Sequence, residues 1–313
     1  MRSPLLDLPG AVAADGVDRD VAAHYGSFNG EQRTLEAGDG FVDLSHRDVV
    51  RVSGPDRLTW LHSLTTQHLE SLAPKVWTGA LVLSPQGHVE HAFVGYDDGL
   101  GDEGAFIAHT EPGTGADLVE FLDRMRFLMR VEVAEVTDEL AVTWRPAAGY
   151  ELVPRDRLAA YAEAAGPACG LWAFEALRIA RGEPRLGLDT DHRTIPNEAG
   201  WIGSAVHLDK GCYRGQETVA RVHTLGRPPR RLTLLHLDGS ENRLPTVGAD
   251  LLHGDKVIGF VGTSARHHEL GPIALAMVKR NVPLDAQLSV EGMPASQEVV
   301  VDPEVGLHVR PLR

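Results

Sequence analysis

The stretch from Asp209 to Arg221 reads DKGCYRGQETVAR and is the most informative segment of the 313-residue chain. Gly211 and Gly215 flank Cys212, and glycine permits a tight turn and a close approach of the backbone to a neighbour. The polar residues from Gln216 onward predict a short helix whose N–H groups face the turn. A cysteine near a helix N-terminus and basic neighbours has the setting of a reactive thiol, whereas the alternative is a small buried apolar side chain.

The region around this stretch is basic. Between positions 210 and 231 the net charge is +5, although the formal net charge of the whole chain is −14. The charged residues are Lys210, Arg214, Arg221, Arg227, Arg230 and Arg231, against Glu217 alone. Such an island suits a small anion such as a carboxylate tail or a phosphate, and the alternative is a solvated basic loop beside an interdomain linker.

The composition is that of a globular protein, with 43% apolar and 24% charged residues. The acidic balance disfavours indiscriminate binding to nucleic acid or to an anionic membrane, so neither is expected as a direct partner. Cys169 and Cys212 are too few for a disulfide framework and are predicted to be free thiols in a reducing compartment. No apolar run is long enough to span a bilayer, and the acidic N-terminus is no secretory or transit signal, so we predict a cytoplasmic protein.

Strands and helices are mixed without a strict βαβ rhythm, which favours an α+β architecture. Residues 1–22 have few large apolar side chains and are predicted to form a loosely ordered tail. A capping-box pattern at 53–56 predicts a helix with a leucine stripe to position 72, and further helices are expected at 117–129 and 171–180.

A domain boundary is expected at residues 226–229, Gly-Arg-Pro-Pro, because two prolines interrupt regular structure. Short strand-like runs separated by glycine and proline turns follow, at 232–237, 257–261, 273–278 and 287–290. Residues 227–313 are therefore predicted to form a small β-barrel. Residues 23–226 form the preceding α+β region, with an internal boundary between two interlaced subdomains near 140–150.

The segment from Lys210 to Glu217 resembles the signature K-G-C-[FY]-x-G-Q-E of the YgfZ family, folate-binding iron–sulfur maturation factors related to the glycine-cleavage T-protein, an aminomethyltransferase. Further resemblances lie at 177–179, 182–184 and 195–198, and in the first half at 43–46, 52–56 and 64–67. The resemblance covers the chain from about residue 24 to its end.

This resemblance implies a T-protein-like cloverleaf of two interlaced α/β regions and a C-terminal β-barrel around a central cavity that binds tetrahydrofolate or a one-carbon derivative. It implies a functional thiol at Cys212, supported by Lys210. Folate contacts are expected from Trp77, Glu198, Arg214 and Arg221, although Trp77 could equally be a core tryptophan. The motif residues are Lys210, Gly211, Cys212, Tyr213, Gly215, Gln216 and Glu217.

Two departures from T-proteins argue against aminomethyl transfer. Where T-proteins carry an Asp pair after a glycine turn, this chain reads GHVEHA from Gly87 to Ala92, and Ala180 takes the place of a second carboxylate. Proton transfer to a folate nitrogen needs a positioned acid or base, and Glu90 or His91 would have to substitute.

We therefore expect a tetrahydrofolate-binding accessory protein for iron–sulfur cluster assembly or repair, with iron–sulfur client or assembly proteins as partners, an indirect effect on tRNA-modifying iron–sulfur enzymes and no turnover of its own. One alternative is a folate-dependent one-carbon transferase of the aminomethyl type. Another is a transient metal or cluster carrier, for which His207, Cys212 and His223 would have to converge. Their spacing matches no familiar metal site, so no resident metal is assigned. The pair His267 and His268 is given no role.

Overall fold

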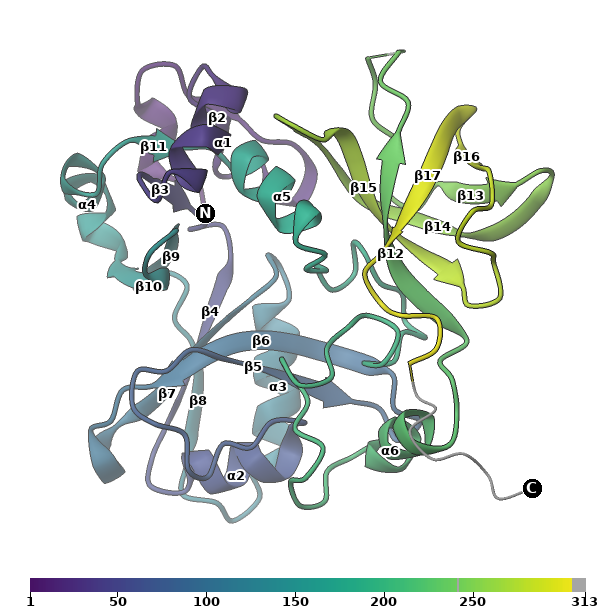
Figure 1. The fold of residues 1–313 in the computed structure, drawn as a ribbon. Coiled ribbons are helices and arrows are strands. Elements are labelled where there is room, and N and C mark those ends of the chain that lie inside the picture. Colours follow the sequence, from purple (N-terminus) through teal and green to yellow (C-terminus); the bar gives the residue numbers. More distant parts are fainter. Residues whose placement is uncertain (241, 306–313) are drawn as a thin grey trace. The chain divides into compact units, whose positions relative to one another are not determined.

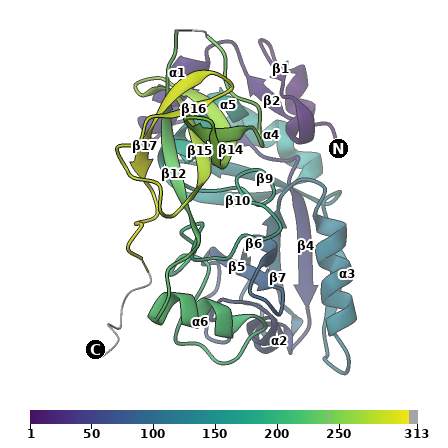
Figure 2. The ribbon, with the colours of Figure 1, turned by 90° about the vertical axis from the view of Figure 1, so that its right-hand side faces the viewer.

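The computed structural model describes residues 1–240 and 242–305, drawn in Figures 1 and 2. The chain divides into two compact units. Unit 1 comprises Met1–Ala80 and Ala92–Phe174, and unit 2 comprises Leu81–His91 and Glu175–Arg313. Unit 2 thus includes residues 81–91, which lie within the stretch of sequence that otherwise forms unit 1. The sequence predicted a boundary between 23–226 and 227–313, with two interlaced subdomains in the first region. None of the helices in the described ranges is long and apolar enough to cross a membrane.

The larger sheet of unit 1 has the strand order β5-β6-β7-β4-β8. Helix α3 packs against β4 and β8, and α2 against β7 (Figure 2). The tip of the β5–β6 hairpin, residues 81–91, belongs to unit 2. The bounds are β4 Asp48–Ser53, α2 Arg57–Leu64, β5 Thr78–Leu83, β6 Val89–Asp97, η3 Gly101–Glu103, β7 Ala105–Thr110, α3 Gly115–Met125 and β8 Glu132–Glu135.

The smaller sheet of unit 1 has the order β10-β9-β3-β11, and its apolar cluster includes Leu5, Phe41 and Leu158. Strand β11 pairs with β3 in parallel, and β9 pairs with both neighbours antiparallel. The bounds are α1 Phe28–Glu36, β3 Phe41–Asp43, β9 Leu140–Arg145, β10 Gly149–Pro154, η4 Arg155–Arg157, α4 Leu158–Ala164 and β11 Ala168–Cys169.

The first 24 residues are ordered, in contrast to the predicted loose tail. They form η1 Pro4–Asp7, β1 Val12–Ala13, η2 Gly16–Asp18 and β2 Ala22–His24. Leu5 and Val21 are only 1% and 0% exposed, and the buried Ser3 hydroxyl donates to the Asp43 carboxylate. Two buried apolar side chains and one buried hydrogen bond therefore order this segment, although its average composition predicted a loosely ordered tail.

Unit 2 contains a closed six-stranded barrel in the order β12-β15-β14-β13-β16-β17, which confirms the predicted C-terminal barrel. All six strands contribute to one apolar cluster, which includes Leu235 and Leu237 and is therefore the barrel interior. The alternate residues Leu232 and Leu234 face a second cluster shared with α5. The bounds are β12 Arg230–Leu237, β13 Asp250–His253, β14 Lys256–His267, β15 Gly271–Lys279, β16 Leu288–Val290 and β17 Met293–Val299. Residues 306–313, the end of the predicted barrel domain, lie outside the described residues.

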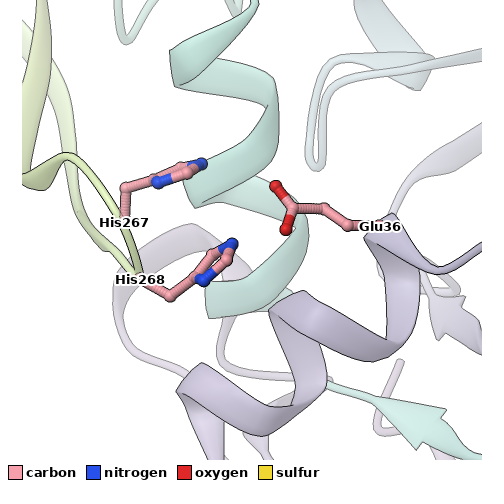
Figure 3. Close-up of side chains that lie close together, drawn as sticks. All are labelled: Glu36, His267 and His268. Atoms are coloured by element: carbon pink, nitrogen blue, oxygen red, sulfur yellow. The ribbon is translucent and has the colours of Figure 1, made fainter.

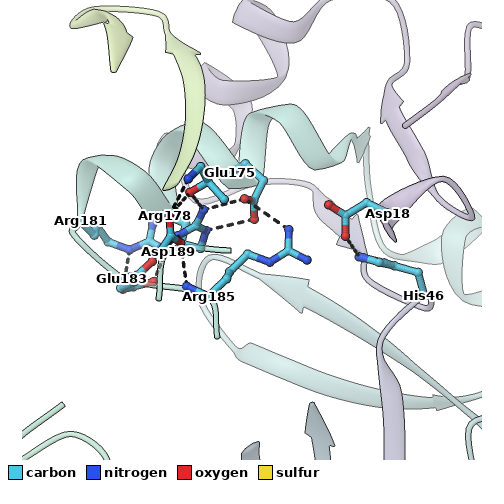
Figure 4. Close-up of polar contacts among 9 residues, drawn as sticks. Asp18, His46, Glu175, Arg178, Arg181, Glu183, Arg185 and Asp189 are labelled. Carbon is cyan, nitrogen blue, oxygen red and sulfur yellow. Dashed lines mark hydrogen bonds and ion pairs between the residues drawn. The ribbon is translucent and has the colours of Figure 1, made fainter. Parts of the chain in front are cut away.

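A buried charge cluster fastens the end of α5 (Leu171–Ala180) to the barrel (Figure 4). The Arg178 guanidinium donates to both Glu175 oxygens at 3.1 and 2.7 Å, to Asp189 Oδ2 at 3.2 Å and to Thr263 Oγ1 at 2.5 Å. Asp189 Oδ1 in turn accepts from the Thr263 amide at 2.6 Å. Arg178 is 3% exposed and its charge is paired, as burial of a charged group requires. Within the family-like segment 177–179, this arginine therefore stabilises the fold.

The predicted helix at 171–180 is confirmed, and so is the helix beginning at Gln216, α6 Gln216–Thr224. The helix after residue 56 ends at Leu64 rather than at residue 72. Its N-cap Asp56 makes no side-chain capping bond, because its carboxylate binds Arg130 instead. Helix α3 ends at Met125, four residues before the predicted end.

Candidate functional site

The cysteine motif forms a turn against the hairpin tip of unit 2. Gly215 has φ +80° and is the N-cap of α6. A Cβ atom on Gly215 would lie 2.6 Å from the Ser84 carbonyl oxygen, and one on Gly87 would lie 2.7 Å from Thr218. Glycine at position 215 therefore meets both demands anticipated from the sequence, a left-handed backbone and a close approach to a neighbouring chain segment.

Cys212 is exposed within this turn, four residues before the first residue of α6. Lys210 is 5% exposed, and its Nζ lies 5.0 Å from the centroid of the Tyr213 ring, which is itself 8% exposed. A desolvated cation over an aromatic face is stabilised by the ring quadrupole. The arrangement fixes Lys210 and Tyr213 as the buried base of the turn and leaves the sulfur accessible to solvent.

By contrast, Cys169 is 1% exposed in unit 1. Burial raises the pKa of its thiol to about 12, and the carboxylates of Glu31 and Asp39 add to the shift. Cys169 is therefore a protonated structural residue, and Cys212 is the thiol available for chemistry.

Arg214 and Glu90 form an ion pair across the motif and the hairpin, with 3.4 Å between Arg214 Nη1 and Glu90 Oε2. Both side chains are more than a third exposed, so this pair contributes little to stability and can be exchanged for a ligand. Arg221 is exposed in the last turn of α6. The two predicted anion-binding arginines are thus accessible.

Glu198 is 1% exposed and is bound by Arg230 rather than open to a ligand. Arg230 Nε donates to Glu198 Oε1 at 2.9 Å, and Nη1 donates to Asp191 Oδ2 at 2.6 Å. Burial opposes the charge on Asp191, but hydrogen bonds from Arg230 and Thr194 lower its pKa to about 2. Residues 195–198 are therefore bound to β12 through Arg230, a member of the basic island for which no separate role was predicted.

Trp77 belongs to unit 1, where it lies in an aromatic cluster with Tyr96, His109 and Tyr150. Its ring centroid is 4.7 Å from Tyr96 and 5.8 Å from both His109 and Tyr150, and His109 lies 4.4 Å from Tyr150. The tryptophan and both tyrosines are only partly buried. The Arg47 guanidinium lies 5.7 Å from the Tyr150 centroid.

His109 carries an unused hydrogen-bond donor into this cluster. It is 1% exposed, and Arg47 Nη1 lies 3.4 Å from its Nδ1. Burial lowers the pKa of His109 well below its usual value and the nearby Arg47 cation lowers it further, so the ring is neutral. An arginine can only donate, so Nδ1 accepts and the ring proton resides on Nε2. Among the described residues, neither this Nε2–H nor Arg47 Nε has a hydrogen-bond partner.

In the described part of the chain, the groups of His, Cys, Asp and Glu with ligand atoms close enough to share a metal ion do not include Cys212. In unit 1, ligand atoms of His62, His68 and Glu70 lie within 4.8 Å of one another. However, the Leu69 amide donates to His62 Nδ1 at 3.2 Å, which places the proton of the neutral ring on Nε2 and opposes metal binding there. His267 and His268 stack with centroids 4.9 Å apart (Figure 3), and His267 Nδ1 accepts from the Glu269 and Leu270 amides.

The fold is that of the aminomethyltransferases, mixed α and β with a closed six-stranded barrel. The chain resembles the crystal structure of the glycine cleavage system aminomethyltransferase T of Bartonella henselae, with a TM-score of 0.76 and 18% sequence identity. The match covers 93% of each chain. An aminomethyltransferase of Streptomyces avermitilis is 26% identical over 86% of both chains. A chloroplastic protein of Arabidopsis thaliana, provisionally named a transferase, is 25% identical over 84% of this chain and 71% of its own length. No family model matches the chain.

The structure thus brings the cysteine motif, Glu90 and the hairpin tip together within unit 2, and Glu198 is joined to Arg230 in the same unit. Trp77 lies in unit 1 with three partners that sequence reasoning missed. Those partners, Tyr96, His109 and Tyr150, come from three different strands, and no local spacing links them. Only tertiary structure could identify this cluster.

Proposed function

We propose that the protein binds tetrahydrofolate, or a one-carbon derivative of it, through the aromatic cluster of unit 1. The observation that carries the proposal is the buried Nε2–H of His109, which has no acceptor among the described residues, on a ring that contacts the aromatic rings of Trp77 and Tyr150. A buried donor without a partner costs free energy, and a ligand acceptor would remove that cost. A pterin offers both a flat ring for stacking and ring nitrogens and a carbonyl oxygen that accept hydrogen bonds.

Arg214 and Arg221 belong to unit 2, and taken by themselves their chemistry suits a carboxylate of a folate. Its glutamate tail carries carboxylates, and Arg214 and Arg221 are accessible cations in an otherwise acidic chain. Guanidinium groups bind carboxylates with charge-assisted, often bidentate hydrogen bonds. The curated aminomethyltransferases that the chain resembles support the same class of ligand.

We further propose that the protein acts as an accessory factor in iron–sulfur cluster assembly or repair, through the exposed thiol of Cys212, and not as a turnover transferase. The exposure of Cys212 supports a role for its sulfur, since an accessible thiol can meet a client protein or bound ligand. The segment Gly87–Ala92 lacks the Asp pair of T-proteins and Ala180 takes the place of a second carboxylate, so the acids and bases that T-proteins offer there are missing.

A folate-dependent one-carbon transferase is the second candidate. One observation favours it specifically: Glu90, the acid nearest to the lost Asp pair, is exchangeable because its ion pair with Arg214 is long and exposed. In this role Glu90 would hold or move a proton at a folate nitrogen.

The binding proposal is tested by calorimetric titration of the full chain with tetrahydrofolate under anaerobic conditions. Trp77→Leu and His109→Leu are each expected to weaken binding at least about tenfold, as loss of stacking or of a buried hydrogen bond predicts. Trp172→Leu is the matched control, because Trp172 is 45% exposed in the same unit and outside the cluster. If Trp77→Leu and His109→Leu both bind tetrahydrofolate as tightly as the wild type, the proposed location of the binding site is wrong.

The two functional candidates are separated by activity. The accessory role predicts no methylenetetrahydrofolate formation from glycine-derived or other aminomethyl donors, and predicts that Cys212→Ser fails to restore iron–sulfur enzyme activity in a deletion strain. The transferase role predicts turnover that Glu90→Gln abolishes. Full restoration by Cys212→Ser would remove the thiol from either account.

A further inference from the structure

Arg47, directly before β4 in unit 1, is a buried cation with no carboxylate partner among the described residues. It is 6% exposed, and its Nη1 lies 3.4 Å from Nδ1 of His109. Its guanidinium carbon lies 5.7 Å from the ring centroid of Tyr150 and 5.9 Å from that of Phe174. Burial of a charge is costly unless the charge is paired, and these aromatic and imidazole neighbours offset only part of that cost.

Arg47 and His109 together present two unused hydrogen-bond donors. Arg47 Nε and His109 Nε2 are both buried and have no partner in the part of the chain that the structure describes. An arginine cannot accept a hydrogen bond, and Nε2 carries the ring proton of His109, so both atoms require an acceptor. Both side chains also lie against the ring of Tyr150, since the His109 centroid is 4.4 Å from it. The two donors therefore belong to the same end of the aromatic cluster.

These donors define the chemistry of a ligand that would satisfy them. An edge of acceptor atoms would pair with both donors, whereas an N–H group on that edge would face a donor and leave it unpaired. A carbonyl oxygen has two lone pairs and can accept two hydrogen bonds. The charge of Arg47 strengthens a bond to such an oxygen.

A pterin ring has one side that fits this requirement and one that does not. Its carbonyl oxygen O4 is an acceptor, whereas its 2-amino group and N3–H are donors. With the 2-amino side turned toward Arg47 and His109, donors would face donors. Only the side that carries O4 can pair with them.

We infer that Arg47 and His109 make this end of the cluster specific for an acceptor, so that it binds the carbonyl oxygen O4 of a pterin and rejects a ring with an amino group in that place. The inference rests on the proposed folate site, and it adds Arg47 as a ligand contact and fixes which side of the ring faces the two donors.

The test compares tetrahydrofolate with its 4-amino analogue in the same tetrahydro form, in which an amino group replaces O4. Both compounds carry the same glutamate tail, so contacts of the tail cancel in the ratio of their dissociation constants. In anaerobic calorimetric titrations of the full wild-type chain, the dissociation constant should be at least about tenfold higher for the 4-amino analogue. The replacement removes an acceptor and places a donor against two donors.

Arg47→Met removes the cation together with its donors and should lower that ratio to less than about a third of the wild-type value. Replacing a buried ionic group by an apolar one of similar volume is often neutral, so this variant is expected to fold. Arg51→Met is the matched control. It makes the same exchange in β4 at a side chain that is 37% exposed and paired with Glu139, and it should leave the ratio unchanged.

Equal or tighter binding of the 4-amino analogue by the wild type overturns the inference but leaves folate binding intact. A ratio that Arg47→Met does not lower also overturns it, because the discrimination then comes from another part of the site. If neither compound binds, the proposed folate site is wrong and the inference is overturned with it. The wild-type comparison requires no variant, so it decides the inference even if Arg47→Met fails to fold.

Discussion

Arg230 and Arg231 are adjacent in β12 but differ in their surroundings, so replacing each by methionine should change the free energy of unfolding by very different amounts. Arg230 binds two carboxylates, Asp191 and the buried Glu198. Arg231 is 0% exposed and has no carboxylate among its described partners; its Nη2 donates to Gln297 Oε1 at 2.5 Å, while Nε and Nη1 have no partner in the described chain. Burial accordingly lowers the pKa of Arg231.

Arg230→Met leaves Glu198, 1% exposed, as an uncompensated buried charge. Removing one partner of such a pair costs about 3–5 kcal/mol of the free energy of unfolding. Arg231→Met gives up two hydrogen bonds, from Nη2 to Gln297 Oε1 and to the Val282 carbonyl oxygen, but it also removes the desolvation cost of a cation that has no carboxylate partner among the described residues. We expect Arg231→Met to change the free energy of unfolding by less than about 1 kcal/mol, or to raise it. Replacing buried ionic groups with apolar groups of similar volume is often neutral or stabilising.

Urea unfolding at pH 7 gives the two free energies, and hydrogen exchange of peptides from β12 reports on unit 2 by itself. The double variant Arg230→Met/Glu198→Gln should recover part of the loss, which identifies the stranded carboxylate as its cause. The reasoning is refuted if Arg231→Met costs as much as Arg230→Met. In that case the neighbourhood of Arg231 must contain an anion that compensates it.

Three further predictions concern single positions. His109 is neutral in the folded chain but is protonated in the unfolded chain below about pH 6.5, so it lowers stability as pH falls, by about 1.4 kcal/mol per unit below that value; urea midpoints at pH 7.5 and 5.5 should differ more for the wild type than for His109→Asn. Gly215→Ala combines a positive φ with a backbone clash and should cost more than Gly203→Ala, which has φ +90° but no atom within 4 Å of the added Cβ; thermal unfolding compares the two. In the native protein a thiol reagent at pH 8 should modify Cys212 rapidly and Cys169 only after unfolding, and two rapidly reacting thiols would contradict the assigned burial.

Local sequence signals predicted those parts of the fold that depend on local chemistry. The helix Leu171–Ala180 followed from its apolar pattern and its glycine stop, and the start of α6 from the polar run after Gly215. The barrel followed from short apolar runs after two prolines, yet β13 and β17 were missed. Strand β17 contains Pro294 and is largely exposed along its second half, so it lacks the apolar run that marks a strand.

The remainder depends on tertiary contacts that no local pattern encodes. The family motif indicated Glu198 as a folate contact, but its partner Arg230 lies 32 residues away and occupies it. Likewise Trp77 was a candidate on resemblance alone, while its neighbours Tyr96, His109 and Tyr150 come from separate strands. The buried donor that makes this cluster a binding candidate is visible only when burial and hydrogen bonding are known.

The exchange of residues 81–91 into unit 2 affects how the chain can be made. Glu90 is synthesised 124 residues before its partner Arg214, which at ribosomal speeds of roughly 5–20 residues per second is a delay of roughly 6–25 s. Throughout that interval the hairpin tip lacks the motif turn, in which Gly215 approaches the Ser84 carbonyl oxygen. The hairpin tip in the first third of the chain can therefore complete its contacts only after the motif in the last third has been synthesised. This interval is when binding of a chaperone to the nascent chain would matter most.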